Sequence, residues 1–211
     1  MSKTLPTLTL GAAMAALIAA RAKHQPKAVF VATMSAQFAL DRLGETARRI
    51  DSVPLMGGAS GIGLGIALAR PDVPVVVIDG DSSLLMELGS LVTVATNRPA
   101  RYLHIVVDNR VQFNGLRNMP APSVEAGVDF VAMARGAGYA HAQRIDDAAN
   151  WVAALPQLLA REGTSFVELG VNPDAPRVNA QQPQPILPDL QFVRMRMGVR
   201  KLGAELLENG R

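Results

Sequence analysis

Two short polar segments carry the residues best suited to chemistry. Asp81 follows the apolar run 75–78, and Asp108 with Asn109 follows the apolar run 103–107. If the two runs are neighbouring parallel strands, their polar ends meet at one edge of the sheet. Carboxylate, amide and carbonyl oxygens are hard ligands for Mg²⁺, which keeps positions open for phosphate oxygens. The pattern therefore predicts a site for Mg²⁺ and a phosphate-bearing ligand.

A helix expected to begin near Leu84 would strengthen this site. Its N-terminus lies beside Ser82 and Ser83, and the free N–H groups of a helix N-terminus attract anions such as phosphate. Taken separately, Asp81 is typical of a helix N-cap and the pair 108–109 of a turn. Their joint spacing across a strand–helix–strand unit favours the shared site over these structural roles.

The two segments resemble the signature of thiamine-diphosphate-dependent enzymes. That signature is Gly-Asp-Gly and, after a helix and a further strand, Asn-Asn; residues 80–82 are Gly-Asp-Ser and residues 108–109 are Asp-Asn. Residues 56–60, Met-Gly-Gly-Ala-Ser, are similar to the Met-Gly-His-Ala-Ser stretch of phosphonopyruvate and sulfopyruvate decarboxylases. The resemblance extends over roughly residues 10–169 and implies the diphosphate-binding domain of such an enzyme.

This resemblance implies two cofactors, thiamine diphosphate and Mg²⁺. By the family pattern, Asp81, Asn109 and the carbonyl of Val111 would hold the metal. Met56 would bend the thiamine diphosphate, and the carbonyl of Pro54 would contact its 4′-amino group. The bend brings that nitrogen near C2 of the thiazolium ring, the carbon that attacks a 2-oxo acid. The implied cofactor-binding residues are Pro54, Met56, Gly57, Gly80, Asp81, Ser82, Ser83, Asn109 and Val111.

The resemblance also implies a partner chain. Thiamine enzymes activate the aminopyrimidine with a glutamate from a second domain, and 211 residues accommodate only the diphosphate-binding one. We expect no catalytic residue in this chain and a pyrimidine-binding alpha subunit that supplies the glutamate in a hetero-oligomer. The expected activity is decarboxylation of a small 2-oxo acid in the cytoplasm, by a lyase that works only with its partner. An acetolactate synthase-like carboligase subunit and a non-catalytic cofactor-binding subunit are the alternatives.

Three positions depart from the family pattern. Ser82 stands where glycine is usual, which restricts the backbone at the diphosphate. Asp108 replaces the first asparagine, and we expect it to accept hydrogen bonds behind the metal ligands rather than to bind the metal. Gly58 stands where the related decarboxylases have histidine. Because an imidazole is missing there, we expect larger or apolar 2-oxo acids to be preferred.

A glycine-rich segment supports a different and less favoured interpretation. Residues 57–63, with Asp79 after the next strand, resemble the dinucleotide loop of short-chain dehydrogenases. That loop needs a strong preceding strand, and residues 53–55 are short and contain a proline. Neither Tyr102 nor Tyr139 has the lysine four residues on that those enzymes use as a catalytic partner.

The surrounding pattern predicts an α/β fold, with three layers and a mostly parallel central sheet between helices. Apolar runs without polar alternation indicate strands buried on both faces. The expected strands are 28–32, 75–78, 103–107, 166–171 and, more weakly, 140–144. Helices are expected from about Leu10 to before Pro26 and over 36–49, 59–70, 83–96, 124–136 and 147–162. Residues 1–172 form the predicted cofactor-binding domain, and 173–211 a proline-rich extended segment with a final helix, about 189–208, packed on it.

Composition narrows the remaining possibilities. The net charge of +3 is spread over 21 basic and 18 acidic residues without a block of one sign, which argues against a nucleic-acid or membrane-surface role. The chain has no cysteine, so disulfide and thiolate chemistry are excluded. The apolar N-terminal segment has helical spacing and is expected to be a packed helix rather than a secretion signal.

Overall fold

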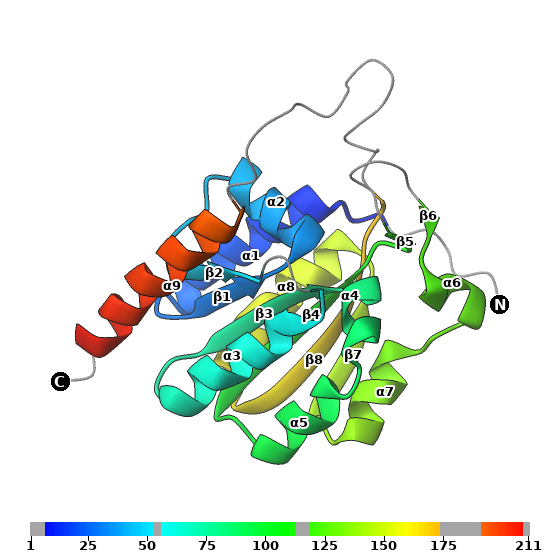
Figure 1. Ribbon diagram of the computed structural model, residues 1–211. Helices are drawn as coiled ribbons and strands as arrows, with labels where there is room; N and C mark the ends of the chain where they lie inside the picture. The colour runs from blue at the N-terminus through cyan, green and yellow to red at the C-terminus, as the bar shows by residue number, and fades with distance from the viewer. Residues whose placement is uncertain (1–6, 53–55, 113–118, 174–190, 209–211) are drawn as a thin grey trace.

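The computed structural model describes residues 7–52, 56–112, 119–173 and 191–208. Its centre is a six-stranded sheet in the order β2-β1-β3-β4-β8-β7, with every neighbouring pair parallel. This confirms the expected three-layer α/β fold (Figure 1). The strands are β1 (Val29–Ala32), β2 (Arg49–Asp51), β3 (Val75–Gly80), β4 (Arg101–Asp108), β7 (His141–Ile145) and β8 (Gly163–Gly170); β5 (Val111–Gln112) and β6 (Met119–Pro120) form a separate antiparallel ribbon.

Helices cover both faces of the sheet (Figure 1). The core on one face joins the strands to α1, α2 and α8, and the core on the other joins them to α3, α5 and α7. The helices are α1 (Leu10–His24), α2 (Met34–Arg42), α3 (Gly58–Ala69), α4 (Asp81–Met86), α5 (Ser90–Asn97), α6 (Pro122–Ala126), α7 (Phe130–Ala137), α8 (Ala148–Ala160) and α9 (Gln191–Glu208). None of the helices in the described ranges is long and apolar enough to cross a membrane.

The first helix is packed, as expected. Met14 and Leu17 of α1 are fully buried, and the hydroxyl of Thr9 accepts the N–H of Ala12 at the helix start (3.3 Å). The indole N–H of Trp151 in α8 donates to the carbonyl of Ala13 (2.9 Å). This bond fixes α8 against α1 on the face of the sheet that lies away from α3.

The expected helix over 36–49 is wrong in its second half. Helix α2 ends at Arg42, and residues 49–51 form the edge strand β2. Gly44 takes a left-handed conformation (φ 71°) just after the helix, which ends the helical hydrogen bonding and turns the chain. Arg49, which the helical pattern had absorbed, instead begins the strand beside β1.

Two other expected helices are each broken into two. The helix over 83–96 divides into α4 and α5, and the helix over 124–136 divides into α6 and α7. Gly127 separates the second pair in a left-handed conformation (φ 62°), and the side chain of Asp129 caps α7. The first pair parts at Glu87, whose backbone (φ −134°, ψ 46°) leaves the helical region.

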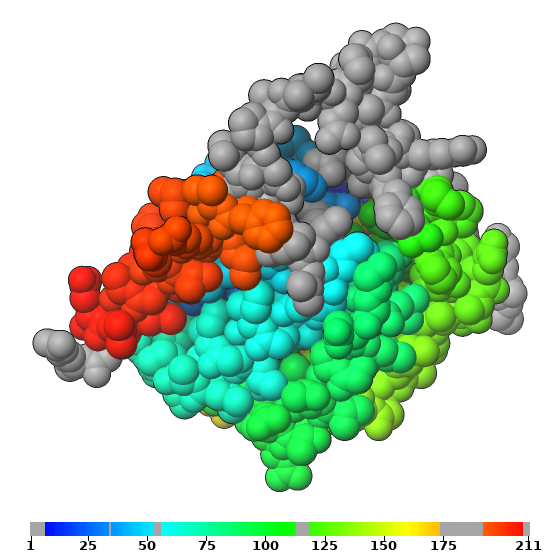
Figure 2. Space-filling model, viewed as in Figure 1, coloured from blue at the N-terminus to red at the C-terminus, as the bar shows by residue number. Residues whose placement is uncertain are grey.

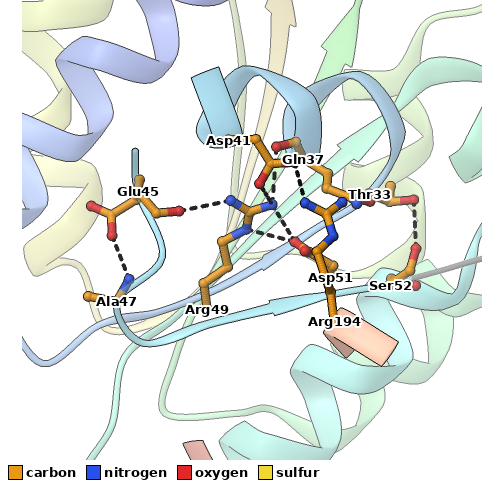
Figure 3. A network of polar contacts seen from close by, with 9 residues as sticks. All are labelled: Thr33, Gln37, Asp41, Glu45, Ala47, Arg49, Asp51, Ser52 and Arg194. Carbon is orange, nitrogen blue, oxygen red and sulfur yellow. Dashed lines mark hydrogen bonds and ion pairs between the residues drawn. The ribbon is translucent and has the colours of Figure 1, made fainter. Parts of the chain in front are cut away.

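Arg49 ties β2 to the helices around it (Figure 3). Its guanidinium is buried and forms ion pairs with Asp51 (2.6 Å) and with Asp41 of α2 (3.0 Å). Arg194 of α9 binds the other oxygen of Asp41 (2.8 Å). Burial raises the pKa of Asp51, although the charge of Arg49 opposes that rise. The cluster therefore fixes the last helix to the edge of the sheet.

Helix α9 lies along that edge and stands out on one side of the molecule beside α3 (Figure 2). Leu202 is buried against the α3 face, and the Arg70 guanidinium at the end of α3 bonds the carbonyl of Leu206. Residues 174–188 of the proline-rich segment lie outside the described residues. The division of the chain at residue 172 stays a prediction.

The glycines of α3 have a packing role at one position. A Cβ on Gly63 would lie 2.4 Å from Cγ2 of Val77 and 3.3 Å from the ring of Tyr102. The absent side chain therefore lets α3 approach β3 and β4 closely. A Cβ on Gly65, two residues further along and on the exposed side of the helix, would meet nothing within 4 Å.

Gly63 and Gly65 provide a matched test of this contact. Gly63→Ala should lower the free energy of unfolding by about 1–3 kcal/mol, because the added methyl overpacks the helix against the sheet. Gly65→Ala should raise it by about 0.5–1 kcal/mol, because alanine loses less backbone entropy in a helix. Urea unfolding gives both values, and equal effects at the two positions would contradict the assignment.

Candidate functional site

The carboxyl ends of β3 and β4 bring the two polar segments together. The strands pair from Val75 with Tyr102 to Gly80 with Val107, so Asp81 and Asn109 follow at the same edge. The backbone N–H of Arg110 donates to Oδ2 of Asp81 (3.2 Å). The predicted meeting of these segments is thus observed in the structure.

Asp81 is buried at the first position of α4. Its Oδ1 accepts the N–H of Ser82 (2.6 Å), and only 3% of the residue is exposed. Burial raises the pKa of Asp81 to about 7, with a further rise from the charge of Asp108, against the lowering effect of the N–H donors. A carboxylate whose charge is disfavoured in this way is suited to a divalent cation, which would restore its ionised form.

Asn109 shapes the turn that follows β4. Its Oδ1 accepts the N–H of Val111 (3.1 Å), and the intervening Arg110 is held in a left-handed conformation (φ 61°). The carbonyl of Arg110 accepts the N–H of Ala121 (3.0 Å) from the end of the β5–β6 ribbon. A non-glycine residue in this region is uncommon and is retained where the surroundings determine it. The turn brings the backbone N–H of Arg110, between Asn109 and Val111, against Asp81.

The glycine segment before α3 is joined to α4. The N–H of Gly57 donates to Oγ of Ser83 (2.7 Å), and Gly57 is left-handed (φ 88°). A Cβ on Gly57 would lie 2.4 Å from Cγ of Glu87, so only glycine fits. The hydroxyl of Ser82 is buried with no partner at hydrogen-bond geometry among the described residues. Two serine hydroxyls thus stand at the start of α4.

The remaining expected contacts are placed only in part. Met56 is partly buried directly before Gly57, whereas Pro54 lies outside the described residues. The hydroxyl of Thr33 donates to the carbonyl of Ser52 (3.2 Å), which joins the ends of β1 and β2 just before that gap (Figure 3). Gly80 is extended, and its N–H donates to Oδ1 of Asp79 (2.8 Å).

An arginine that the sequence pattern did not single out contacts Asp108, at the end of β4. Arg144 of β7 forms an ion pair with Asp108 (2.9 Å) and a second with Glu168 of β8. The chain carries no local signal for this contact, because 36 residues separate Arg144 from Asp108. Only the strand order, with β8 between β4 and β7, brings the two side chains together.

His104 is a buried core residue, as expected. It is fully buried on β4, and its Nδ1 lies 3.1 Å from the hydroxyl of Tyr139. Its Nε2 lies 3.6 Å from Oδ2 of Asp79. At that separation the two atoms are in contact but not hydrogen-bonded, and neither has another hydrogen-bond partner among the described residues. Asp79 directly precedes Gly80 in the sequence, so the contact between Asp79 and His104 lies next to the proposed cofactor segment.

No group of three or more histidine, cysteine, aspartate or glutamate side chains that could hold a metal occurs in the described part of the chain. The acidic side chains near Asp81 do not form such a group, since Asp108 is engaged by Arg144. A metal at this edge would therefore need mixed ligands: a carboxylate, an amide oxygen and a backbone carbonyl. Asp81, Asn109 and Val111 provide that combination.

Residues 33–169 match the family model described as thiamine pyrophosphate enzyme, C-terminal TPP binding domain. The chain belongs to this family. The matched range begins directly after β1 and ends one residue before the end of β8. It includes both polar segments. The dinucleotide-binding interpretation is therefore dropped, and Gly63 accounts for part of the glycine pattern through packing alone.

Curated relatives include two kinds of decarboxylase. The chain is 34% identical over 175 residues to phosphonopyruvate decarboxylase of Streptomyces hygroscopicus. The aligned region covers 82% of this chain and 42% of the relative. It is 37% identical over 118 residues to sulfopyruvate decarboxylase subunit beta of Methanothermobacter thermautotrophicus, covering 56% of this chain and 59% of the relative. The chain thus matches less than two thirds of the length of either protein.

A solved structure shows the same fold. A protein from Mycobacterium smegmatis, described as thiamin diphosphate-dependent, superposes with a TM-score of 0.61 at 19% identity. The superposition covers 80% of this chain and 32% of that protein. At this identity the likeness supports the fold and the strand order rather than the individual side chains.

Ser83→Ala tests the link between the glycine segment and α4. Loss of the hydroxyl leaves the buried N–H of Gly57 without an acceptor, so the free energy of unfolding should fall by about 1–3 kcal/mol. Ser90→Ala is the matched control, because the hydroxyl of Ser90 is buried and has no hydrogen-bond partner in the part of the chain that the structure describes, so its removal should change stability little. Denaturant unfolding of both variants measures the difference, and a similar loss in each would show that the Gly57 contact contributes nothing.

Proposed function

We propose that this chain is the diphosphate- and Mg²⁺-binding subunit of a two-subunit, thiamine-diphosphate-dependent 2-oxo acid decarboxylase. The observation that carries this proposal is the meeting of Asp81 with the Asn109 turn at the ends of β3 and β4. Family membership supports the cofactor, and the similarity to phosphonopyruvate and sulfopyruvate decarboxylases supports the reaction class.

The metal would be held by Asp81, Asn109 and the carbonyl of Val111. Asp81 supplies the negative charge, and its burial means that a cation gains more from it than from an exposed carboxylate. One lone pair of the Asn109 amide oxygen accepts the N–H of Val111. The second lone pair could bind the metal. These few protein ligands leave positions for diphosphate oxygens and water.

The diphosphate would lie at the start of α4, where two hydroxyls are available. Ser83 accepts the N–H of Gly57, so its own proton remains free to donate to a phosphate oxygen. Ser82 offers a buried hydroxyl that makes no hydrogen bond of normal geometry within the described residues, together with the backbone at the position where the family usually has glycine. Gly80 and Gly57 let the backbone approach closely, and Met56 and Pro54 would contact the aminopyrimidine end.

Thiamine diphosphate, when bound, supplies a thiazolium ring that accepts the electron pair released as a 2-oxo acid loses CO₂. The residues of this chain bind and orient the cofactor and keep water from it. We assign the acid that activates the aminopyrimidine to an alpha subunit of the pyrimidine-binding type. This assignment is supported by relatives named as beta subunits. Gly58, at the start of α3, leaves space that favours larger or apolar 2-oxo acids.

Asp81→Ala tests the metal site. In the assembled enzyme the variant should lose Mg²⁺-dependent binding of thiamine diphosphate, because removing the charged ligand should cost about 3 kcal/mol or more. Isothermal calorimetry with cofactor and Mg²⁺ measures the affinity. Asp72→Ala, which removes an exposed carboxylate paired with Arg70 at the far end of α3, is the control. Unchanged affinity in Asp81→Ala would show that the metal lies elsewhere.

The partner assignment predicts a large difference in activity. The chain alone should release CO₂ from 2-oxo acids about 10²–10⁴-fold more slowly than the complex, because general acid–base assistance at the aminopyrimidine is absent. The comparison uses equal thiamine diphosphate and Mg²⁺ with and without a co-expressed pyrimidine-binding subunit. Full activity from the chain alone would contradict the two-subunit arrangement.

A further inference from the structure

Arg144 reaches across one strand to bind a residue of another. It belongs to the edge strand β7, where it is paired with Glu168 of β8, while Asp108 of β4 is paired with Gly170 of β8. Side chains alternate between the two faces of a strand, and the strand neighbours of Arg144, Glu168, Asp108 and Gly170 belong to the core under α1 and α8. These four residues therefore lie on the face toward α3, α5 and α7. The guanidinium therefore crosses β8 to reach Asp108 (2.9 Å).

Gly170 leaves the space for this crossing. A Cβ there would lie 2.8 Å from Nη2 of Arg144 and 3.0 Å from Cβ of Asp146. Its φ is not in the left-handed region, so backbone freedom does not explain the glycine. A side chain at this position would therefore force the guanidinium to shift from its present place beside Asp108. The contact between Arg144 and Asp108 thus involves one residue in each of three strands: Arg144 in β7, Gly170 in β8 and Asp108 in β4.

The charge of Asp108 matters because of its neighbours. It directly precedes Asn109, and its negative charge acts on Asp81 across the ends of β3 and β4. Without a counter-charge, Asp108 would compete with Asn109 for a metal ion and would repel the diphosphate. Burial alone would lower the pKa of Arg144, but its contacts with Asp108 and Glu168 raise it, so the guanidinium stays charged.

We propose that Arg144 is a positioning residue of the metal and diphosphate site, which holds the carboxylate of Asp108 off the metal and cancels its charge toward the diphosphate. This inference rests on the proposed function, since it concerns the same site. The proposal predicts opposite changes in the affinities for Mg²⁺ and for diphosphate, whereas loss of a purely structural arginine would lower both. Removing the cation should strengthen the binding of Mg²⁺ alone and weaken the binding of the diphosphate.

The test compares both affinities in Arg144→Gln. In the full chain, calorimetry with Mg²⁺ alone should show binding tightened by about threefold or more, and inorganic diphosphate at saturating Mg²⁺ should bind about tenfold more weakly. Adding Asp108→Asn to Arg144→Gln should return both affinities to within about twofold of the original. A fall in both affinities that follows the loss in thermal stability, without rescue by Asp108→Asn, would overturn the proposal.

Two further variants keep the test decisive if Arg144→Gln fails to fold. Gly170→Ala should reproduce the same opposite shifts, because its methyl would occupy the path of the guanidinium. Asp108→Asn alone should leave Mg²⁺ affinity within about twofold of the original and diphosphate binding at least as tight, because Arg144 already keeps Asp108 from the metal; a large loss of Mg²⁺ affinity there would show that Asp108 binds the metal and would refute the proposal. If the unaltered chain binds neither Mg²⁺ nor diphosphate, the proposed function falls together with this inference. If it binds both and the variants match it, only the inference falls.

Discussion

The parallel pairing of β3 with β4 is the constraint on which the site depends. The two strands stay in register over six residue pairs, from Val75 with Tyr102 to Gly80 with Val107, and they end at the same level of the sheet. Every group proposed to hold the metal follows directly from one of these ends. A slip of one residue would turn Asp79 and His104 to the other face, and it would part Asp81 from the Asn109 turn. The buried contacts behind the strands therefore act on the site by fixing its register.

Burial gives the carboxyl end of the sheet its chemical character. Three carboxylates, those of Asp79, Asp81 and Asp108, are nearly inaccessible there, and each has a different environment. Asp79 lies beside a histidine, Asp108 is paired with an arginine, and Asp81 accepts the backbone N–H groups of Ser82 and Arg110. Of the three, Asp81 is the carboxylate with neither a histidine nor an arginine side chain paired with it in the described structure. This difference in surroundings, more than the identity of the residues, distinguishes the proposed metal ligand from its neighbours.

The sequence predicted what depends on local pattern. The apolar runs that became β3 and β4 indicated buried strands, and their polar ends could be expected to meet because one helix connects them. It failed where a distant contact decides the conformation. The expected helix ran from 36 to 49, but the helix ends at Arg42 before the left-handed Gly44, and Arg49 begins an edge strand. The contact of Arg144 with Asp108 could not be predicted, since it requires knowing that β8 lies between their strands. The metal and cofactor roles of the individual residues stay predictions.

Trp151 is the single tryptophan of the chain, and its position has an optical consequence. Its ring is fully buried and its indole N–H is bound to the carbonyl of Ala13, on the face of the sheet covered by α1 and α8. Helix α4 and its two serines belong to the opposite face. Intrinsic fluorescence excited at the tryptophan band therefore reports whether the first and eighth helices are docked. Because ligands at the start of α4 do not touch that environment, the emission can follow folding independently of what the carboxyl end of the sheet has bound.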